Sequence, residues 1–251
     1  MIFKTFSLWS QIYLYLTKLN NLNSFSKSLI FIDIDNTLIT PNTDLGSDHF
    51  FDWQIDLIQK KDSKALANNI PNMLNILFEL WNHIDYRLCD NEVNQVFKNL
   101  MLEGKSDLVL CTARSIKTQN ITLKSLEQFN IPQYLSTTLV DNTLNNQNTL
   151  SLKIKDGIIY CNGKDKGQII ESFIKNINKS YNYIILIDDK LSNLDKFIKH
   201  NNRSNIIAIH YTGMDNIVNQ FKQGSKDIVL TEYNQFIKNK NKNKNNNTCK
   251  F

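Results

Sequence analysis

The chain has 251 residues, of which 41% are apolar, with 29 Lys and Arg against 24 Asp and Glu and only 7 Gly and 3 Pro. This size and composition are typical of one sizeable globular domain, with or without an insert, and exclude a wholly disordered, collagen-like or turn-dense chain. The excess lysines all lie in residues 238–251, which contain no acid, so the rest of the chain is neutral. A basic body for binding nucleic acid is therefore excluded.

Residues 1–27 are predicted to form an amphipathic helix that packs on the core. Apolar side chains recur at helical spacing from Ile2 to Leu16, and Lys4 and Gln11 break up what would otherwise resemble a signal-peptide core. An anchor on a membrane surface is the alternative for this helix. We expect no membrane span, because no stretch reaches the about 18 uninterrupted apolar residues that a span needs.

The four cysteines are scattered along the chain and include no C-x-x-C pair. This pattern favours buried, reduced thiols over a disulfide framework or a zinc site. It predicts a cytoplasmic protein.

Short apolar runs alternate with helical patterns through residues 28–237, which we predict to form the core domain. The runs have the β-branched, continuously apolar character of strands buried on both faces: Leu29–Ile34, Leu108–Cys111, Tyr183–Ile187 and Ile206–Ile209. Apolar stripes at helical spacing lie between them: Val93–Met101, Ile170–Ile177 and Leu191–Ile198. The alternation predicts an α/β fold of three layers, with a Rossmann-like, mainly parallel sheet whose ligand site lies at the carboxyl ends of the strands.

Three segments depart from this alternation. Residues 41–89 are too long for an ordinary crossover and contain a helical stripe that opens at Pro71, so they predict a small helical cap insert. Residues 141–163 contain Asp156 and Gly157, the turn dipeptide of a β-hairpin. Residues 238–251 alternate Lys with Asn and have no apolar period, and we expect them to be disordered.

Two carboxylates follow the first core strand. Asp33 and Asp35 are two residues apart and therefore lie on one face, where like charges repel each other and raise each other's pKa. A divalent cation removes this cost. Mg²⁺ prefers such hard oxygen ligands and commonly takes one or two carboxylates together with a substrate phosphate.

Further polar residues end the other strands or begin the next helix. Thr112 ends the second strand, Asp188 and Asp189 end the third with Asn193 following, and Lys166 begins the helix before it. Each feature alone is weak, because a turn, a helix cap or a solvated lysine would account for it. Their conjunction, in this order at one edge of the sheet, favours a single phosphate and metal site.

These residues resemble the haloacid dehalogenase-like (HAD-like) superfamily of phosphohydrolases over about Phe31 to Tyr211. The D-x-D-x-T pattern of that superfamily stands at Asp33–Thr37, and Thr112, Lys166 and the pair Asp188–Asp189 match its other motifs. Further segments are similar to an uncharacterised bacterial domain-of-unknown-function branch of it: Leu45–Asp48 with Trp53, Asn162–Gly163 with Lys166–Gly167, and His210–Thr212.

The resemblance implies a Mg²⁺-dependent phosphomonoesterase. Asp33 would be the nucleophile that forms an aspartyl-phosphate, and Asp35 would be the general acid and base. The metal would be bound by the Asp33 carboxylate, the Asp35 main-chain carbonyl and Asp189, with Asp188 holding its waters. Thr112 and Lys166 would bind the phosphoryl oxygens, and Asn193 would orient Lys166 or the acidic pair.

Other functions remain as alternatives. A receiver domain uses similar residues, but its acidic pair comes first and its lone acceptor aspartate later. A catalytically silent scaffold that serves as a binding module is the more serious alternative. The Lys/Asn tail lacks interleaved aromatic residues, so we expect no specific nucleic-acid partner.

A helical cap over the site would exclude large substrates, so a small phosphorylated metabolite is the expected substrate. Four residues are candidates for contacts with its leaving group: Asp48, His49, Trp53 and Arg114. Neither the leaving group nor the oligomeric state is encoded in any motif.

Overall fold

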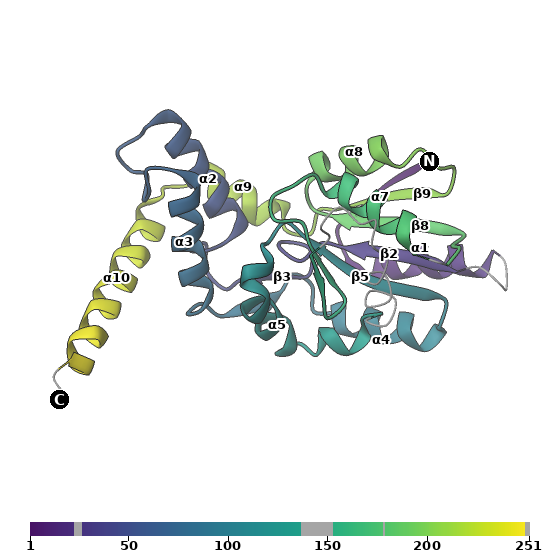
Figure 1. The fold of residues 1–251 in the computed structure, drawn as a ribbon, viewed down its shortest axis with the longest axis horizontal. Coiled ribbons are helices and arrows are strands. Elements are labelled where there is room, and N and C mark those ends of the chain that lie inside the picture. Colours follow the sequence, from purple (N-terminus) through teal and green to yellow (C-terminus); the bar gives the residue numbers. More distant parts are fainter. Residues whose placement is uncertain (23–26, 137–152, 178, 249–251) are drawn as a thin grey trace. The chain divides into compact units, whose positions relative to one another are not determined.

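The computed structural model describes residues 1–22, 27–136, 153–177 and 179–248. The chain forms two compact units, each built from separate stretches of sequence. The first unit comprises Met1–Thr40 and Tyr86–Met214, and the second comprises Pro41–Asp85 and Asp215–Phe251. Figure 1 shows the elements of both.

The strands are β1 (Ile2–Phe6), β2 (Ser28–Ile32), β3 (Ile39–Pro41), β4 (Tyr86–Leu88), β5 (Ser106–Thr112), β6 (Ile154–Lys155), β7 (Ile158–Tyr160), β8 (Tyr183–Asp188) and β9 (Ile206–Tyr211). The α-helices are α1 (Trp9–Asn21), α2 (Asp48–Lys60), α3 (Ile70–Trp81), α4 (Val93–Glu103), α5 (Gln119–Glu127), α7 (Lys166–Asn176), α8 (Leu191–His200), α9 (Asp215–Gln223) and α10 (Asp227–Thr248). Two 3₁₀ turns, η1 (Ile116–Thr118) and η2 (Ile131–Tyr134), flank α5.

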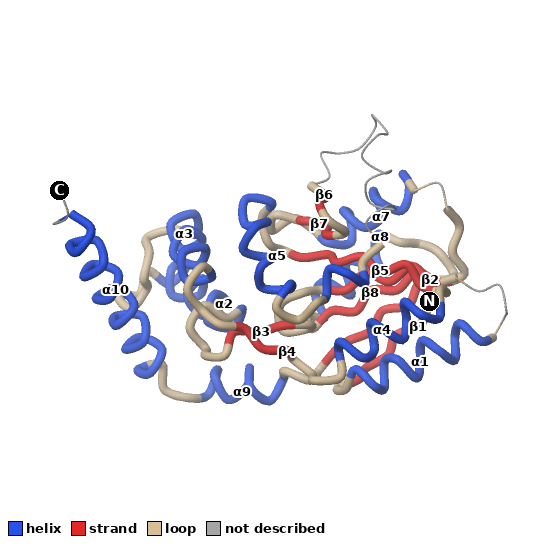
Figure 2. The backbone as a smooth tube through the Cα atoms, turned by 90° about the horizontal axis from the view of Figure 1, so that it is seen from below, coloured by secondary structure: helices blue, strands red, loops and turns tan. Residues whose placement is uncertain are grey.

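A seven-stranded sheet in the order β1-β9-β8-β2-β5-β7-β6 forms the centre of the first unit. Its strand pairs are parallel except for β6 with β7. Helices α1 and α4 pack on one face, and α7 and α8 pack on the other (Figure 2). The three-layer α/β fold predicted from the sequence is thus confirmed, and β2, which precedes Asp33, lies between β5 and β8.

The core strands are buried because their side chains are apolar on both faces. Every residue of β2 is buried, and the ring of Phe31 packs edge-on against Phe173 of α7. The predicted hairpin is also present in the described part of its segment, where Asp156 and Gly157 have φ values of 53° and 77°. Two positive φ angles in succession are characteristic of the tight turn that joins twisted strands. Residues 137–152, the rest of the predicted hairpin segment, lie outside the described residues.

The N-terminal prediction is wrong for the first residues and correct for those that follow. Residues 2–6 form β1, which pairs in parallel with β9, and the helix begins only at Trp9. The run from Ile2 to Phe6 is rich in β-branched and aromatic residues, and the exposed edge of β9 offers its backbone hydrogen-bonding partners. Helix α1 then packs by its apolar face, on which Trp9, Ile12 and Leu16 are buried.

The second unit contains α2, α3, α9 and α10 around its own apolar core. This core combines residues of the insert with residues near the C-terminus: Leu45, Phe50, Met73, Leu80, Phe221 and Val229. We had placed residues up to 237 in the core domain, but residues from Asp215 onward belong with the insert. The insert is therefore completed by two helices that come much later in the sequence.

The expectation of a disordered tail from residue 238 is also wrong, because α10 continues to Thr248. Its first turns are held by Val229, Tyr233 and Phe236, which pack in the second unit. Once these turns are formed, each further residue adds a hydrogen bond at little extra cost, and lysine is a good helix former. Lys240 also forms an ion pair with Glu79 of α3. Residues 249–251 lie outside the described part.

None of the helices in the described residues is long and apolar enough to cross a membrane.

Candidate active site

Asp33 lies at the centre of the predicted site because β2 is a central strand. Its main-chain N–H continues the sheet by donating to the carbonyl of Ile187 on β8, at 2.9 Å. The residue is 6% exposed. A carboxylate this buried is costly unless cations or hydrogen-bond donors compensate its charge.

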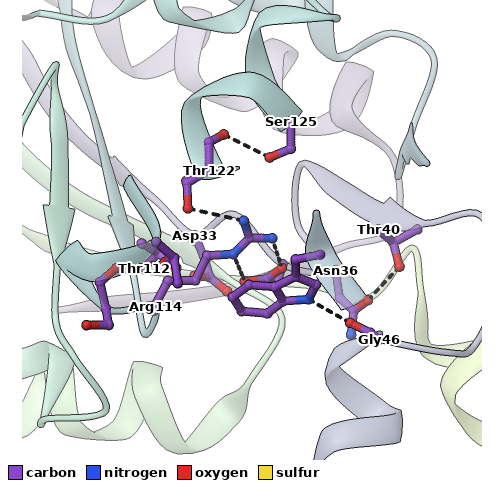
Figure 3. A network of polar contacts seen from close by, with 12 residues as sticks. Asp33, Asn36, Thr40, Gly46, Thr112, Arg114, Thr122 and Ser125 are labelled. Atoms are coloured by element: carbon purple, nitrogen blue, oxygen red, sulfur yellow. Dashed lines mark hydrogen bonds and ion pairs between the residues drawn. The ribbon is translucent and has the colours of Figure 1, made fainter. Parts of the chain in front are cut away.

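The loop after Asp33 forms a tight turn that hydrogen bonds hold in place within the first unit. Asn36 has a φ of 55°, a left-handed conformation that asparagine tolerates, and its side chain accepts a hydrogen bond from Thr40 Oγ1 at 3.1 Å (Figure 3). The indole nitrogen of Trp9 donates to the carbonyl of Thr37 at 3.0 Å. The N-terminal helix thus holds the loop that carries Asp35.

Lys166 provides the compensating positive charge for Asp33. Its Nζ lies 2.8 Å from Asp33 Oδ1 and 2.5 Å from Asp188 Oδ2, and the residue is 2% exposed. Lys166 is the first residue of α7, whose N-terminus is capped by the Asp165 side chain. At Gly167, an added Cβ would lie 2.4 Å from the main-chain oxygen of Lys196. Only glycine allows α7 to approach α8 this closely.

The pKa values of this group reflect burial and mutual charge. The pKa of Asp33 is raised to about 7, chiefly by burial; Lys166 lowers it, and the carboxylates of Asp188 and Asp35 add to the effect of burial. For Lys166, burial lowers the pKa, but Asp188 and Asp33 outweigh it and raise the pKa well above its usual value. The lysine is therefore a permanent cation between two acids.

Asp188 is held by donors from the loop and helix that follow it. Asn193 Nδ2 donates to its two carboxylate oxygens at 3.0 and 3.2 Å, and the main-chain N–H of Lys190 donates to Oδ1 at 2.9 Å. Together with Lys166, these contacts occupy both oxygens of Asp188. Asn193 thus orients Asp188, and its effect on Lys166 is exerted through that residue.

Three carboxylates gather at the ends of β2 and β8. One oxygen from each of Asp33, Asp188 and Asp189 lies within 4.8 Å of the others. Hard oxygen donors at this spacing fit Mg²⁺ or another hard divalent cation. Lys166 pairs with both Asp33 and Asp188, and the assignment of Asp33 and Asp189 as the direct metal ligands stays a prediction.

Thr112 ends β5 beside Asp33 and is fully buried. Its Oγ1 accepts a hydrogen bond from the main-chain N–H of Arg114 at 3.1 Å, which leaves the hydroxyl proton available to a phosphoryl oxygen. The turn after β7 holds the residues that follow Thr112 in place. The N–H groups of Asn162 and Gly163 donate to the carbonyls of Arg114 and Ala113.

The guanidinium group of Arg114 binds Asp35. Nε donates to Asp35 Oδ2 at 3.0 Å and Nη2 donates to Oδ1 at 2.7 Å, so both carboxylate oxygens are paired (Figure 3). The Arg114 side chain is 1% exposed. The sequence predicts Arg114 as a contact to the substrate beyond the phosphate. In the structure it pairs with the second aspartate of the D-x-D pattern, and a contact with substrate stays a prediction.

The other three candidates for substrate contacts lie in the second unit. His49 is 5% exposed, its Nε2 lies 2.8 Å from Asp44 Oδ1, and its ring packs 4.8 Å from that of Phe221. Trp53 packs against the same phenylalanine, and Asp48 begins α2. Packing within the second unit explains His49 and Trp53, and a contact of any of the three with substrate stays a prediction.

Two residues of the site region were not identified from the sequence. The spacing of Trp9 predicts a core residue of an amphipathic helix, and nothing in that spacing indicates the hydrogen bond to Thr37. Tyr86, whose ring lies 5.7 Å from the Arg114 guanidinium carbon, has no pattern around it. Burial raises the pKa of the Tyr86 hydroxyl to about 12, which keeps it neutral beside Arg114.

Several solved structures are similar to the chain at low identity. A Burkholderia xenovorans protein provisionally named a haloacid dehalogenase-like hydrolase is 10% identical, with a TM-score of 0.41, and the match covers 81% of this chain and 88% of that one. A class C acid phosphatase from Bacillus anthracis, solved with tungstate bound, is 15% identical, with a TM-score of 0.42 and coverage of 89% and 85%. No curated protein matches the chain.

The sequence pattern of one protein family extends over nearly the whole chain, from residue 6 to residue 244. It spans both units, including the insert and most of α10. The chain therefore belongs to the family described as protein of unknown function DUF2608.

Proposed function

We propose that the protein is a Mg²⁺-dependent phosphohydrolase that acts on a small phosphorylated metabolite through an aspartyl-phosphate on Asp33. The observation that carries this proposal is the placement of the buried Lys166 ammonium group between Asp33 and Asp188, beside Asp189. A buried ion pair of this kind seldom stabilises a fold more than apolar residues would. The presence of these buried charges therefore favours a role in catalysis over a role in stability. The resemblance of the motifs to HAD-like phosphohydrolases agrees with a catalytic role.

In the first step, a carboxylate oxygen of Asp33 attacks phosphorus. The bond to the leaving oxygen breaks, and the carboxyl group of Asp35 gives its proton to that oxygen. In the second step, the Asp35 carboxylate takes a proton from water as the water oxygen attacks phosphorus. The bond between phosphorus and Asp33 then breaks, which releases phosphate and restores both side chains.

Thr112 and Lys166 bind the non-bridging oxygens in both steps, where a hydroxyl and an ammonium group neutralise the charge of the phosphoryl group. The Asp33 carboxylate, the Asp35 main-chain carbonyl and Asp189 would hold Mg²⁺. When bound, the ion supplies the positive charge that allows the carboxylates to ionise together and that polarises the phosphoryl group. Asp188, oriented by Asn193, fixes Lys166.

Burial supports a small substrate. Thr112 is fully buried, Lys166 is 2% exposed and Asp33 is 6% exposed, so a phosphoryl group reaches them only by entering a site that is largely closed to solvent. A phosphomonoester on a small metabolite fits this restriction better than a phosphorylated side chain on a folded protein. A silent scaffold is less favoured, because it would retain costly buried charges without a use for them.

The test is a screen of phosphorylated metabolites with Mg²⁺ and with excess EDTA, on the wild type and on Asp33→Asn. We expect hydrolysis that needs Mg²⁺ and falls by several orders of magnitude in Asp33→Asn, because a covalent nucleophile is lost. The matched control is Asp56→Asn, which removes a carboxylate that is half exposed on α2. Rapid quenching of the wild type should trap phosphate on the peptide that contains Asp33. Full turnover by Asp33→Asn would contradict the proposal.

A further inference from the structure

Arg114 and Asp35 form a bidentate pair within the first unit. The Nε and Nη2 donors meet separate carboxylate oxygens at 3.0 and 2.7 Å. Such a fork determines both the position and the plane of a carboxylate, which a single ammonium donor does not. Asp35 is 20% exposed on its side chain, so without the fork its carboxylate would be free to rotate toward solvent.

Arg114 is itself held in place from several sides. Its Nη1 donates to Thr122 Oγ1 at 3.3 Å, and its guanidinium carbon lies 5.7 Å from the centre of the Tyr86 ring. Its main-chain N–H and carbonyl are tied to Thr112 and Asn162. Burial alone would lower the pKa of Arg114, but the Asp35 carboxylate outweighs burial and raises it, so the guanidinium is always charged. The group is therefore a fixed cation directed at Asp35.

We infer that Arg114 is a positioning residue, which holds the Asp35 carboxyl group in the orientation from which it exchanges protons with the leaving oxygen and with the attacking water. The inference rests on the proposed function and adds to it a residue outside the motifs. Arg114 does not touch the phosphoryl group in this assignment. Its effect on the reaction is exerted through Asp35, whereas a substrate-binding arginine would act without it.

A residue that positions Asp35 and a residue that binds substrate directly differ in how strongly the effect of their removal depends on the leaving group. An alkyl phosphate releases a basic alkoxide that needs the proton of Asp35, whereas p-nitrophenyl phosphate releases a stable phenolate that needs it much less. Loss of positioning should therefore lower kcat/KM for the alkyl phosphate selectively. A misplaced general acid costs up to about 10²-fold. Loss of substrate binding would lower kcat/KM for both esters alike.

The experiment measures kcat/KM for both esters in Arg114→Met, Arg114→Lys, Asp35→Asn and Asp35→Asn/Arg114→Met. We expect Arg114→Met to lose about 10- to 100-fold on the alkyl phosphate and clearly less on p-nitrophenyl phosphate. Arg114→Lys keeps the charge that balances Asp35, so it remains testable if the Met variant does not fold, and it should show the same selectivity because it lacks the fork. In the double variant, removal of Arg114 should cost nothing further on the alkyl phosphate.

The matched control is Arg203→Met, which removes another bidentate arginine of the first unit, paired with Glu171. It should lower the melting temperature without changing the ratio of the two kcat/KM values. The inference would be overturned if the Arg114 variants lost kcat/KM equally on both esters or lost none on either ester. It would also be overturned if the double variant lost more kcat/KM on the alkyl phosphate than Asp35→Asn alone. The proposed function would survive these outcomes if Asp33→Asn is inactive. Absence of Mg²⁺-dependent turnover in the wild type would overturn both.

Discussion

The indole N–H of Trp9 donates a hydrogen bond to the main-chain carbonyl of Thr37, at 3.0 Å. Trp9 is fully buried at the start of α1, and Thr37 follows the two aspartates of the D-x-D pattern. The contact links the N-terminal segment, which carries no catalytic motif, to the loop that holds Asp35. The helix therefore contributes to the geometry of the site as well as to the core.

The variant Trp9→Phe tests this link. It keeps an aromatic side chain but leaves the Thr37 carbonyl without its donor, which should cost about 1–3 kcal/mol of unfolding free energy. Turnover of an alkyl phosphate should fall as well, because the loop that carries Asp35 loses a fixed point. Denaturant unfolding and steady-state kinetics measure the two effects.

The control for this variant is Tyr181→Phe, which removes a partly buried hydrogen bond to Asp107 at the opposite ends of the core strands. It should cost stability and leave turnover per folded molecule unchanged. A Trp9→Phe variant that loses stability and keeps full turnover would show that the contact supports the fold alone.

Metal-free protein should be less stable at neutral pH than Asp33→Asn. Burial raises the pKa of Asp33 from 3.8 to about 7, so the folded state binds a proton more tightly than the unfolded state does. The resulting stabilisation is fully present below pH 3.8, the pKa of the unfolded state. It is lost as the pH rises through about 7, the pKa of the folded state. In EDTA, the melting temperature of the wild type relative to Asp33→Asn should fall between about pH 4 and about pH 7 and should level off above that range.

Adding Mg²⁺ at about pH 8 should raise the melting temperature of the wild type more than that of Asp33→Asn, since a ligand stabilises the state that binds it. Asp189→Asn should respond weakly as well. Sodium chloride at matched ionic strength separates binding at the site from general screening. An equal response of all three proteins to Mg²⁺ would argue against a metal site at these carboxylates.

The variant Gly167→Ala should displace Lys166. The new Cβ would lie 2.4 Å from the carbonyl oxygen of Lys196 and 2.7 Å from the main-chain nitrogen of Phe197, so α7 has to move away from α8. Overpacking of this kind costs about 1–3 kcal/mol. We expect a lower melting temperature and lower turnover from one substitution.

Gly104→Ala serves as the comparison for this variant. It introduces strain at a φ of 63° after α4, but its Cβ would meet nothing within 4 Å. Stability should fall by about 1 kcal/mol, the cost of a left-handed non-glycine residue. Turnover should not change, and a parallel loss of turnover in both glycine variants would contradict the explanation through Lys166.

Two truncations should separate the packed part of α10 from the rest. Ending the chain after Ile237 removes the ion pair between Lys240 and Glu79, whose side chains are 31% and 35% exposed, and should cost less than about 1 kcal/mol. Ending it after Lys226 removes Val229, Tyr233 and Phe236 from the core of the second unit. Val229 is buried and the two aromatic side chains are partly buried against this core. A fully buried large apolar side chain lost from a core costs about 2–5 kcal/mol, so the shorter chain should unfold far more readily. Thermal melts of the two proteins measure the difference.

The sequence predicts the centre of the sheet well and its periphery poorly. Strands β2, β5, β8 and β9 are apolar on both faces, and that pattern excludes most other structures. The segment from Ile2 to Phe6 is compatible with helix or strand, and the choice depends on the free edge of β9, which lies some 200 residues away in the sequence. Helix α10 is likewise not predicted, because the Lys/Asn composition of its later part does not indicate that its first turns pack in the core of the second unit.

The site shows the same division. The sequence indicates that Asp33, Lys166 and the acidic pair meet, because the carboxyl ends of neighbouring parallel strands share one edge of the sheet. The partner of Arg114 depends on the path of two loops, which no periodicity encodes. Arg114 pairs with Asp35, two positions after Asp33, and the sequence alone does not indicate this pairing.

The pairing of β1 with β9 has a consequence for the synthesis of the protein. Strand β1 has no partner in the sheet until Ile206–Tyr211 have also left the ribosome, since β9 is its neighbour. Contacts this distant in sequence form late and slow the folding of a domain. Until then the apolar residues of β1 have no place in the sheet, so β1 is incorporated after β2, β5 and β8, although it precedes them in the sequence.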